Sequence, residues 1–475
     1  MGDKQQPRLS IKDEFMGADL GDKRRSQRLE FIVERMMEAP AESFPTRFDE
    51  SSELEGTYRF MGNECISPEA IIAPHRNQTV ERASHYDEVL VAHDTTEFNF
   101  GTMEREGVGV VGRRGKSRGF LGHVSLVLAP TESREPLGVL SHQIINRMES
   151  KKQKRKKQNH KRRQQDPDNE SRKWLAGVES VEDALQGKSQ AIHLMDREGD
   201  NYALLAPMVQ KGYRFVVRVT HNRVVAGDED AKVRQVLEES PVIGTRTIEV
   251  GKRGATPTPA YRKKFPARKT RSADVSISAC SVTINRPRSS SECPHESIRL
   301  NVVRVLEKNP PEGEAAVEWY LWTTEPIEDT EQVWKIVDYY RARWVIEELF
   351  KAIKTGCAYE SRQFESLEAL LRALAIFLPI AWQLLRLRTL SHYDDEAPAS
   401  RVLSRVQLLC LRRALWKRCK QAISESPTVR EALLAIAKLG GHLKRNGEPG
   451  WIVLMRGFEK LLNLVDGYLL ARERS

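Results

Sequence analysis

Cysteine is scarce in this sequence, and long apolar runs are missing. The six cysteines among 475 residues form no Cys-x-x-Cys pair, which argues against a disulfide framework and against a zinc site. The longest apolar run, residues 373–382, is short and contains Pro379, and the first residues, MGDKQQPRLSIKDEF, include no apolar signal region. We therefore expect a cytoplasmic protein that is neither secreted nor inserted into a membrane.

Positive charge, by contrast, is in excess. The chain has 76 Lys and Arg against 66 Asp and Glu, a formal net charge of +10. This balance favours a polyanionic partner, although charge alone does not distinguish DNA from RNA or from an acidic protein. With 40% hydrophobic residues, the chain is long enough for one large core and smaller domains around it.

The first 85 residues have the pattern of a small helical domain. After Asp22, the residues Leu29, Ile32, Val33 and Met36 recur at helical spacing, and EGTYRFMGN and ISPEAIIAPHRNQTVERA continue the helical signal. From residue 87 the pattern changes to the β-prone runs EVLVAHDTTEFNF, HVSLVLAP and PLGVLSHQII, typical of successive antiparallel strands.

Helices and strands then alternate. ESRKWLAGVESVEDALQ and NYALLAPMVQKG are helical in pattern, and QAIHLMD and YRFVVRVT are strands, which implies parallel pairing and an α/β fold class. Asp196 falls at the C-terminal end of such a strand, where open α/β sheets bind their ligands.

Two segments interrupt this core, which we expect to span residues 86–365. Nine Lys or Arg among residues 151–163 predict a mobile basic loop within 150–169, and residues 221–325 predict a β-rich insertion. The chain is strongly helical from Thr330 to Lys354, and residues 366–475 predict a helical C-terminal domain.

One predicted helix face carries four polar side chains. Tyr340, Arg343, Glu347 and Lys354 lie at offsets 0, 3, 7 and 14, within about 60° of each other on a regular helix. A face with a phenol, a guanidinium, a carboxylate and an ammonium can hold a phosphate and a metal ion. From spacing alone, a solvated face with an ion pair explains it equally well.

Two aspartates follow apolar strand-forming runs, Asp94 in VAHDTT and Asp196 in LMDREGD. Each alone is as well explained as a cap of a turn or helix. Together with Glu347 they supply the hard oxygen ligands that Mg²⁺ or Mn²⁺ prefers. In-line cleavage of a phosphodiester is served by two such ions, about 3.5 to 4 Å apart, which three carboxylates can hold.

DYYRARWVIEELFKAIKTG resembles the Tyr-x2-Arg-x3-Glu-x6-Lys signature of bacterial insertion-sequence transposases, in particular the group of the Tn-five transposase. The blocks DTTEF, KSRGF, ESRKWL, DREGD and RFVVR are similar to blocks of that family in the same order. LGDKRRSQRL and EGTYRF resemble its N-terminal DNA-binding blocks, and AIAKLGGHLKRNG with LVDGYL resembles its C-terminal region. The resemblance covers nearly the whole chain.

The resemblance implies a ribonuclease-H-like mixed-sheet core with a β insertion, flanked by an N-terminal DNA-end-binding domain and a C-terminal dimerisation domain. It places the acidic triad on Asp94, Asp196 and Glu347 and implies two Mg²⁺ ions, for which Mn²⁺ can substitute. It further implies a homodimer on double-stranded DNA that nicks transposon ends, forms hairpins by attack of the 3′-hydroxyl, and transfers strands into target DNA.

Further DNA contacts follow from the same resemblance. Trp319 lies 21 residues before Tyr340, the spacing of the family's base-stacking tryptophan, and Trp322 is a close competitor because the two can face opposite sides of a strand. Core packing is the simpler explanation for either ring. The other expected DNA contacts, all basic, are Lys351, Arg218, Arg24, Arg25, Arg28 and Arg59.

Two other classes of protein compete with an active transposase. A noncatalytic DNA-binding inhibitor derived from such an enzyme would bind ends without nicking them, and a ribonuclease-H-like nuclease would cleave without joining. For dimerisation, the expected apolar residues are Trp451, Phe458, Leu461, Leu462 and Val465.

Overall fold

The computed structural model describes residues 11–38, 43, 45, 48, 50–112, 115–148, 172–227, 231–251, 254, 267–291, 293–420 and 422–473. The predicted basic loop at 151–163 lies outside them, as does part of the predicted β insertion. The chain divides into two compact units: the first comprises residues 1–190 and 344–475, and the second comprises residues 191–343.

The sheet of the first unit is an antiparallel meander. Its strands are β1 (Glu88–Asn99), β2 (Val110–Val111), β3 (Ser117–Leu128) and β4 (Pro136–Ile145). Residue Leu126 of β3 pairs with Ala92 of β1 and with Val139 of β4, so β3 is the middle strand of the three long ones. The antiparallel arrangement expected from the β-prone runs is confirmed.

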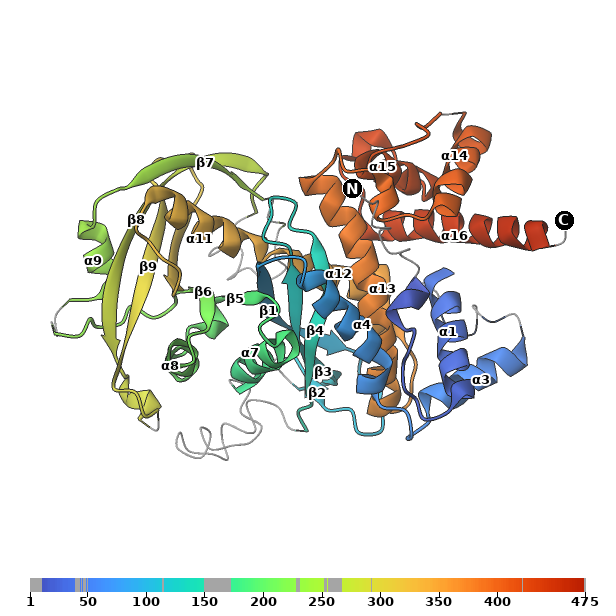
Figure 1. Ribbon diagram of the computed structural model, residues 1–475, viewed down its shortest axis with the longest axis horizontal. Helices are drawn as coiled ribbons and strands as arrows, with labels where there is room; N and C mark the ends of the chain where they lie inside the picture. Colours follow the sequence, from blue (N-terminus) through green and yellow to red (C-terminus); the bar gives the residue numbers. More distant parts are fainter. Residues whose placement is uncertain are drawn as a thin grey trace. The chain divides into compact units, whose positions relative to one another are not determined.

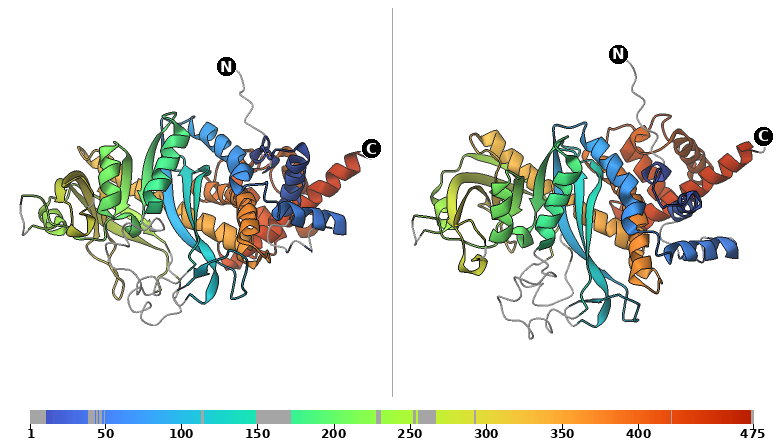
Figure 2. Two further views of the ribbon diagram at one scale, coloured as in Figure 1. Left: turned by 90° about the horizontal axis from the view of Figure 1, so that it is seen from below. Right: turned by 60° about the horizontal axis from the view of Figure 1, so that its bottom comes forward.

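Helices cover both faces of this sheet (Figure 1). Helices α4 (Pro68–Ala83) and α13 (Leu367–Tyr393) pack on β4. Helix α7 (Arg172–Leu185) packs on β3 and β4 from the other face. His142 of β4 contacts Arg76 of α4, and Gln143 lies beside Gly177 of α7, so the two helices lie on opposite faces. Figure 2 shows the strands between α7 and the α4 and α13 pair from another direction.

The remaining helices of the first unit surround these layers. They are α1 (Lys23–Glu38), α3 (Ser51–Met61), α12 (Val345–Lys351), α14 (Arg405–Cys419), α15 (Val429–Leu439) and α16 (Trp451–Glu473), with the short helix η1 (Ile11–Glu14). The helical starts follow local signals: Ser67 caps α4 by accepting from the Ala70 N–H, with Pro68 at the first position, and Ser366 caps α13 likewise.

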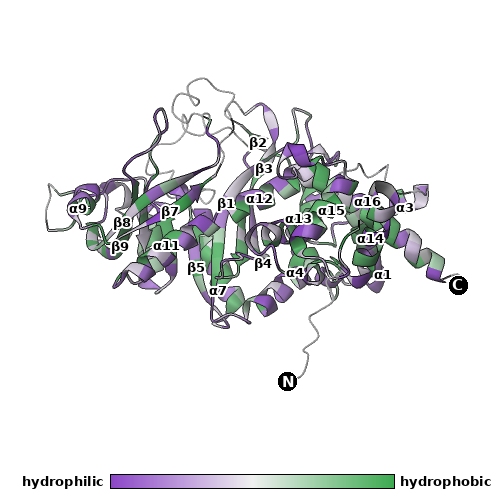
Figure 3. Ribbon diagram, turned by 90° about the horizontal axis from the view of Figure 1, so that it is seen from above, coloured by the Kyte–Doolittle hydropathy of each residue, from purple (hydrophilic) through white to green (hydrophobic). Residues whose placement is uncertain are grey.

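Pro379, which lies in the longest apolar run of the sequence, does not interrupt its helix. It lies inside α13, whose 27 residues are long and apolar enough, by length and composition, to cross a membrane. In the most apolar window of α13, 83% of the residues are buried within the protein. Figure 3 shows the hydrophobic colour gathering around α13 and α15. Packing against neighbours stabilises α13 despite the missing N–H of proline.

The second unit contains a mixed sheet in the order β5-β6-β10-β9-β8-β7. Its strands are β5 (Gln190–Met195), β6 (Arg214–Arg218), β7 (Gly244–Val250), β8 (Arg271–Asn285), β9 (Ser297–Glu307) and β10 (Glu318–Thr323). Strands β5 and β6 are parallel, as the helix and strand alternation predicts, and the other pairs are antiparallel.

The helices of the second unit are α8 (Tyr202–Gln210), α9 (Val233–Glu239) and α11 (Thr330–Ala342), with the short helices η2 (Arg197–Gly199) and η3 (Arg288–Ser290). Helix α8 connects β5 to β6, as a parallel pair requires. The stretch 221–325, expected to be β-rich, contains β7 to β10, and α9 within it was not expected.

Candidate active site

Asp94 lies within β1 and is half-buried. Its backbone pairs with Val124 of β3, which pairs with His142 of β4, so Asp94 lies on the α4 face of the sheet. Its Oδ1 accepts the Thr95 N–H at 2.7 Å. Because Phe98 has the same parity along β1, Asp94 and Phe98 face the same side.

Glu347 lies on α12, which packs on β1. The turn that follows α12 is a π-helix, η4 (Ala352–Gly356), in which the Cys357 N–H bonds to the Ala352 carbonyl. Within it, Lys354 Nζ lies 5.5 Å from the Phe98 ring centroid and donates to the Glu97 carbonyl at 2.5 Å. The first unit therefore places Asp94 and the segment that carries Glu347 on the same face of β1.

The single helix expected from Thr330 to Lys354 is wrong in one respect. Helix α11 ends at Ala342 and α12 begins at Val345. At this junction the Arg343 N–H bonds to Tyr340 and the Glu347 N–H to Trp344, three residues back instead of four. The tightened turn and the π-helix change the rotation per residue, so extrapolating at 100° per residue fails.

The four residues of the predicted polar face belong to two different units. Tyr340 and Arg343 belong to the second unit, and Glu347 and Lys354 belong to the first. Tyr340 and Arg343 are also buried, at 6% and 4% exposure, whereas Glu347 is half-buried.

Asp196 follows β5 directly, as expected, and is half-buried. It has extended backbone geometry and caps the short helix η2, accepting the Glu198 N–H at 2.8 Å. Met195 pairs with Val217 of β6, so the alternation along the strands places Asp196 on the opposite face, the face of Arg218.

Trp319 and Trp322 lie on opposite faces of β10. Trp322 is fully buried and donates its Nε1–H to Asp200, so it is a core residue. Trp319 is half-buried; its ring lies 5.8 Å from the Tyr340 ring and 5.7 Å from the Arg218 guanidinium. Burial lowers the pKa of Arg218 to about 10, and the neighbouring Tyr340 opposes this shift. We call Trp319, Tyr340 and Arg218 the tryptophan platform.

Sequence reasoning missed Glu348, which neighbours Glu347 on α12. Glu348 accepts from Lys351 at 2.6 Å and from Trp451 Nε1 of α16 at 3.0 Å, and Arg388 of α13 lies 3.4 Å away. Burial alone would raise the pKa of Glu348, but these donors together lower it. Three elements of the first unit therefore meet at this carboxylate, and its only sequence signal is the second Glu of IEELF.

The N-terminal arginines differ in exposure and contacts. Arg24 and Arg59 are exposed and form ion pairs with Asp22 and Glu55 respectively. Arg25 donates to the Leu20 carbonyl at 3.0 Å. The guanidinium of Arg28 lies against Gly56 of α3, where a Cβ would be 3.0 Å from its Cζ.

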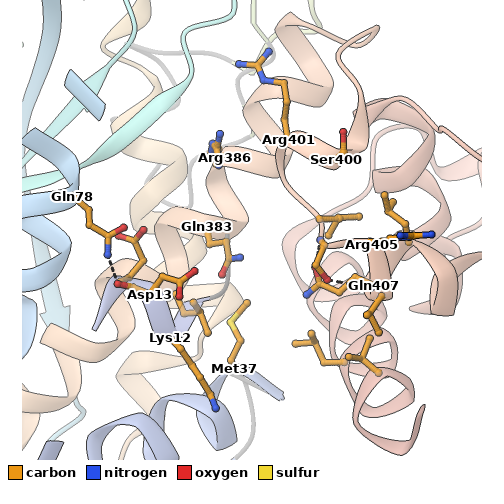
Figure 4. A pocket seen from close by; sticks show the side chains of 18 of the residues that line it. Lys12, Asp13, Met37, Gln78, Gln383, Arg386, Ser400, Arg401, Arg405 and Gln407 are labelled. Atoms are coloured by element: carbon orange, nitrogen blue, oxygen red, sulfur yellow. Dashed lines mark hydrogen bonds between the residues drawn. The ribbon is translucent and has the colours of Figure 1, made fainter. Parts of the chain in front are cut away.

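Part of the predicted dimer contact is not available in this structure. Trp451, Phe458 and Leu461 are buried at 6%, 2% and 0% exposure within the first unit, because α16 packs against α14 and α15. Leu462 and Val465 line a cavity of about 1590 Å³ in the same unit. Figure 4 shows this cavity with Gln78, Gln383 and Gln407 among its lining residues. This cavity also borders η1, α4 and α13, and neither Asp94 nor Glu347 lines it.

The three acids do not all belong to one unit: Asp94 and Glu347 belong to the first, and Asp196 belongs to the second. Within either unit, the described residues contain no group of three His, Cys, Asp or Glu side chains arranged to hold a metal ion. The donor set of the three acids consists of carboxylate oxygens alone, which fits a hard divalent cation such as Mg²⁺.

Comparison with protein families agrees with these observations. A family described as transposase DNA-binding matches residues 8–66, which include the four N-terminal arginines. A family described as the transposase DDE domain matches residues 140–378, half of the 475-residue chain. Asp196 and Glu347 lie inside that match, and Asp94 precedes it.

The chain therefore belongs to the transposase DDE-domain family. It is a DDE-type transposase, an enzyme that acts on DNA, with a DNA-binding domain at residues 8–66. Enzymes of this class generally use divalent metal ions.

Proposed function

We propose that this transposase moves a DNA segment by cut-and-paste, with Asp94, Asp196 and Glu347 as its Asp-Asp-Glu triad. The observation that supports the assignment best is that Asp94 and the segment of Glu347 share one face of β1, with a lysine beside them. Asp196 follows β5 at the end where α/β sheets bind ligands.

The proposal divides the chain by function into residues 1–85, which bind transposon ends, a ribonuclease-H-like core at 86–365, and a C-terminal dimerisation region at 366–475. The mixed sheet with helices on its faces is consistent with such a core. Its Tyr340, Arg343, Glu347 and Lys354 resemble the signature of the Tn-five group, and this resemblance supports placing the enzyme in that group. We expect it to work in the cytoplasm, on double-stranded DNA.

The triad carboxylates would hold two Mg²⁺ ions, or Mn²⁺ in their place. When bound, such ions stabilise charge on the attacking and leaving oxygens of a phosphodiester. The protein's own cations add to this: Arg343, Lys351 and Lys354 would hold the phosphates that flank the bond to be cut. Lys354 is oriented for this by the Glu97 carbonyl and lies 3.8 Å from Glu360.

Cleavage would proceed by successive displacements at phosphorus. Water attacks the phosphodiester at the transposon end and releases a 3′-hydroxyl, which then attacks the opposite strand to form a hairpin and free the flanking DNA. A second water opens the hairpin, which leaves a 5′-phosphate and the 3′-hydroxyl of the transposon. This 3′-hydroxyl finally attacks a phosphodiester of target DNA and releases the target's own 3′-hydroxyl. In the synaptic homodimer each subunit would cut the end that its partner binds.

The tryptophan platform would receive the base that hairpin formation forces out of the helix. Stacking on Trp319 returns roughly 1–3 kcal/mol of the unstacking cost. Tyr340 and Arg218 are buried behind it, so they support the Trp319 ring. Arg24, Arg25, Arg28 and Arg59 would contact the end sequence.

The test is cleavage of the protein's own transposon ends with Mg²⁺. We expect nicked, hairpinned and then blunt ends from the parent protein, and end binding without nicking from Asp94→Ala, Asp196→Ala and Glu347→Ala. The rate should fall by at least about 1000-fold, since several kcal/mol of charge stabilisation is lost. Cleavage by all three variants at the parental rate would refute the triad.

A further inference from the structure

Asp200 lies four residues after Asp196 and has its side chain fully buried in the second unit. Its Oδ2 accepts the backbone N–H groups of Thr220 at 2.6 Å and His221 at 2.8 Å. Its Oδ1 accepts from Arg223 Nη1 and from Trp322 Nε1 at 3.2 Å. Both carboxylate oxygens are taken up by protein donors and the side chain has no exposed surface, so we assign Asp200 an indirect role in the reaction.

We propose that Asp200 is a positioning residue that holds the turn of Asp196 and the tryptophan platform in one fixed relation. This inference rests on the proposed function, because it assigns Asp196 to the triad and Trp319 to base stacking. Asp200 itself lies in the turn after β5, and the groups that it binds come from two other places in the sequence: the segment after β6, and β10.

The turn on the Asp196 side is short and tight. Gly199 closes it with an N–H bond to the Asp196 carbonyl, and a Cβ at Gly199 would lie 2.7 Å from Cβ of Met195. Thr220 adds a second link, since its hydroxyl donates to the Arg197 carbonyl at 3.2 Å. These hydrogen bonds hold the backbone of residues 196–200 to the segment after β6.

The segment after β6 is also connected to the tryptophan platform through Arg218, the last residue of β6. Arg218 ends β6 two residues before Thr220, and its Nη2 donates to the Glu318 carbonyl at 2.7 Å, next to Trp319. Trp322, which donates to Asp200, pairs with Val217 across β6 and β10. Asp200 thus binds Trp322 of β10 and the segment that follows β6, whereas Asp196, Trp319 and Arg218 lie on the sheet face opposite to Trp322.

The chemistry of the site requires a carboxylate. All four partners of Asp200 are donors, and an ionised carboxylate is the side chain of this size that only accepts. In Asp200→Asn, the amide N–H₂ would face two donors whichever way it turned. The loss of these bonds should loosen the turn of Asp196 and the platform together, since a shared network couples its members.

The experiment uses the full-length protein on its own transposon ends, with 2-aminopurine at the base next to the cut as a probe of flipping. For Asp200→Asn we expect unchanged end binding, about 10- to 100-fold slower nicking, and a higher Mg²⁺ concentration for half-maximal rate, as supporting residues of metal sites show. The 2-aminopurine signal should fall as well, because the platform shifts.

Glu307→Gln is the matched control. Glu307 is also a buried carboxylate of the second unit, bound by Arg271 and by the Val317 N–H at 2.9 Å, but it lies on β9 away from β5. It should lower stability without changing the half-maximal Mg²⁺ concentration. If Asp200→Asn does not fold, Trp322→Phe removes one donor and keeps most of the ring, and we expect a severalfold loss in both nicking and flipping.

The outcomes separate the two levels of the proposal. A parent protein that neither nicks nor flips would refute the proposed function. A parent that does both, with folded Asp200→Asn and Trp322→Phe variants that match it in nicking, Mg²⁺ dependence and flipping, would overturn the role of Asp200 alone. Equal effects of Glu307→Gln would reduce that role to general stability and also overturn it.

Discussion

The two units support their acidic residues by different means. In the first unit, Glu347 lies on α12, and its neighbour Glu348 is bound by side chains of α12, α13 and α16 at the edge of solvent. In the second unit, Asp196 lies in a turn, and its neighbour Asp200 is bound out of solvent by backbone and side-chain donors.

The difference follows from the local structure of each acid. A helix such as α12 fixes its own backbone by internal bonds, so partly exposed ion pairs suffice to hold it in place. A turn has few internal bonds, and its conformation depends on bonds from outside, which are stronger when buried. We therefore expect the second unit to be more sensitive to single substitutions near its acid.

The largest expected effect concerns the two tryptophans of β10. Trp322→Ala should lower the free energy of unfolding by about 3–5 kcal/mol, because it removes a fully buried ring. Trp319→Ala should cost about 1–2 kcal/mol, because that ring is half-buried, and should mainly reduce hairpin formation. Urea unfolding and end cleavage measure the two effects. Equal destabilisation by both variants would contradict the assignment of Trp319 to the platform.

The next effect is acid sensitivity of the first unit. Burial lowers the pKa of His123 to about 3, below its ordinary value of 6.5, and the charge of Lys173 contributes. Because the unfolded chain takes up a proton at His123 more readily than the folded protein, the free energy of unfolding decreases as the pH falls below 6.5. At pH 5 the decrease due to His123 is about 2 kcal/mol. The pKa of Glu14 is also lowered, to about 2, so Glu14 likewise makes the protein less stable as the pH falls, but only below about pH 4.5.

Unfolding at pH 7 and pH 5 checks this expectation, with hydrogen exchange to locate the loss on β3. His123→Gln does not titrate in this range, so its stability should change less between the two pH values than that of the parent. An identical pH dependence in parent and variant would contradict the neutral, buried state of His123.

A smaller effect is expected at Glu348, whose contacts with Trp451 and Arg388 attach α12 to α16 and α13. Glu348→Gln should slow cleavage about tenfold, the lower end of the range for residues that support a metal site, and lower stability by only about 1 kcal/mol. Glu448→Gln is the control, because Glu448 is an acid of the same region that pairs with Arg430 instead of contacting α12. If both variants cleave at the parental rate, the position of Glu347 does not depend on the contacts of Glu348.

The smallest expected effect concerns Gly56 and Arg28. A Cβ at Gly56 would displace the flexible end of Arg28, so Gly56→Ala should weaken end binding roughly threefold, less than about 1 kcal/mol. A gel-shift titration measures the change, with Gly62→Ala in the same region as control. Unchanged binding by Gly56→Ala would mean that Arg28 does not contact the end from this position.

Much of the local structure could be predicted from the sequence. Strand β4 coincides with the run PLGVLSHQII, and α7 and β5 agree with their patterns to within two residues. These elements are long, periodic and bounded by capping or turn residues, so local signals define them. The motifs were sufficient to predict a DDE transposase, which the family match confirms.

The sequence could not predict how distant segments meet. Alternation along β10 separated Trp319 from Trp322 but did not say which face α11 would cover, and Asp200 binds a residue 122 positions away. Apolar residues of α16 looked like a dimer contact because a stripe shows that a face is covered, not what covers it.

The sequence by itself determined the excess of positive charge and most of the helices and strands, and it proposed which acidic residues form the triad. Only the tertiary structure decided that Pro379 stays within α13, that the helix before Glu347 breaks at Arg343, and that Trp322 is core while Trp319 is not. The physical reason is that helix capping and hydrophobic periodicity depend on residues a few positions apart in the sequence. Burial and tertiary hydrogen bonds depend instead on distant segments that come together only when the chain folds.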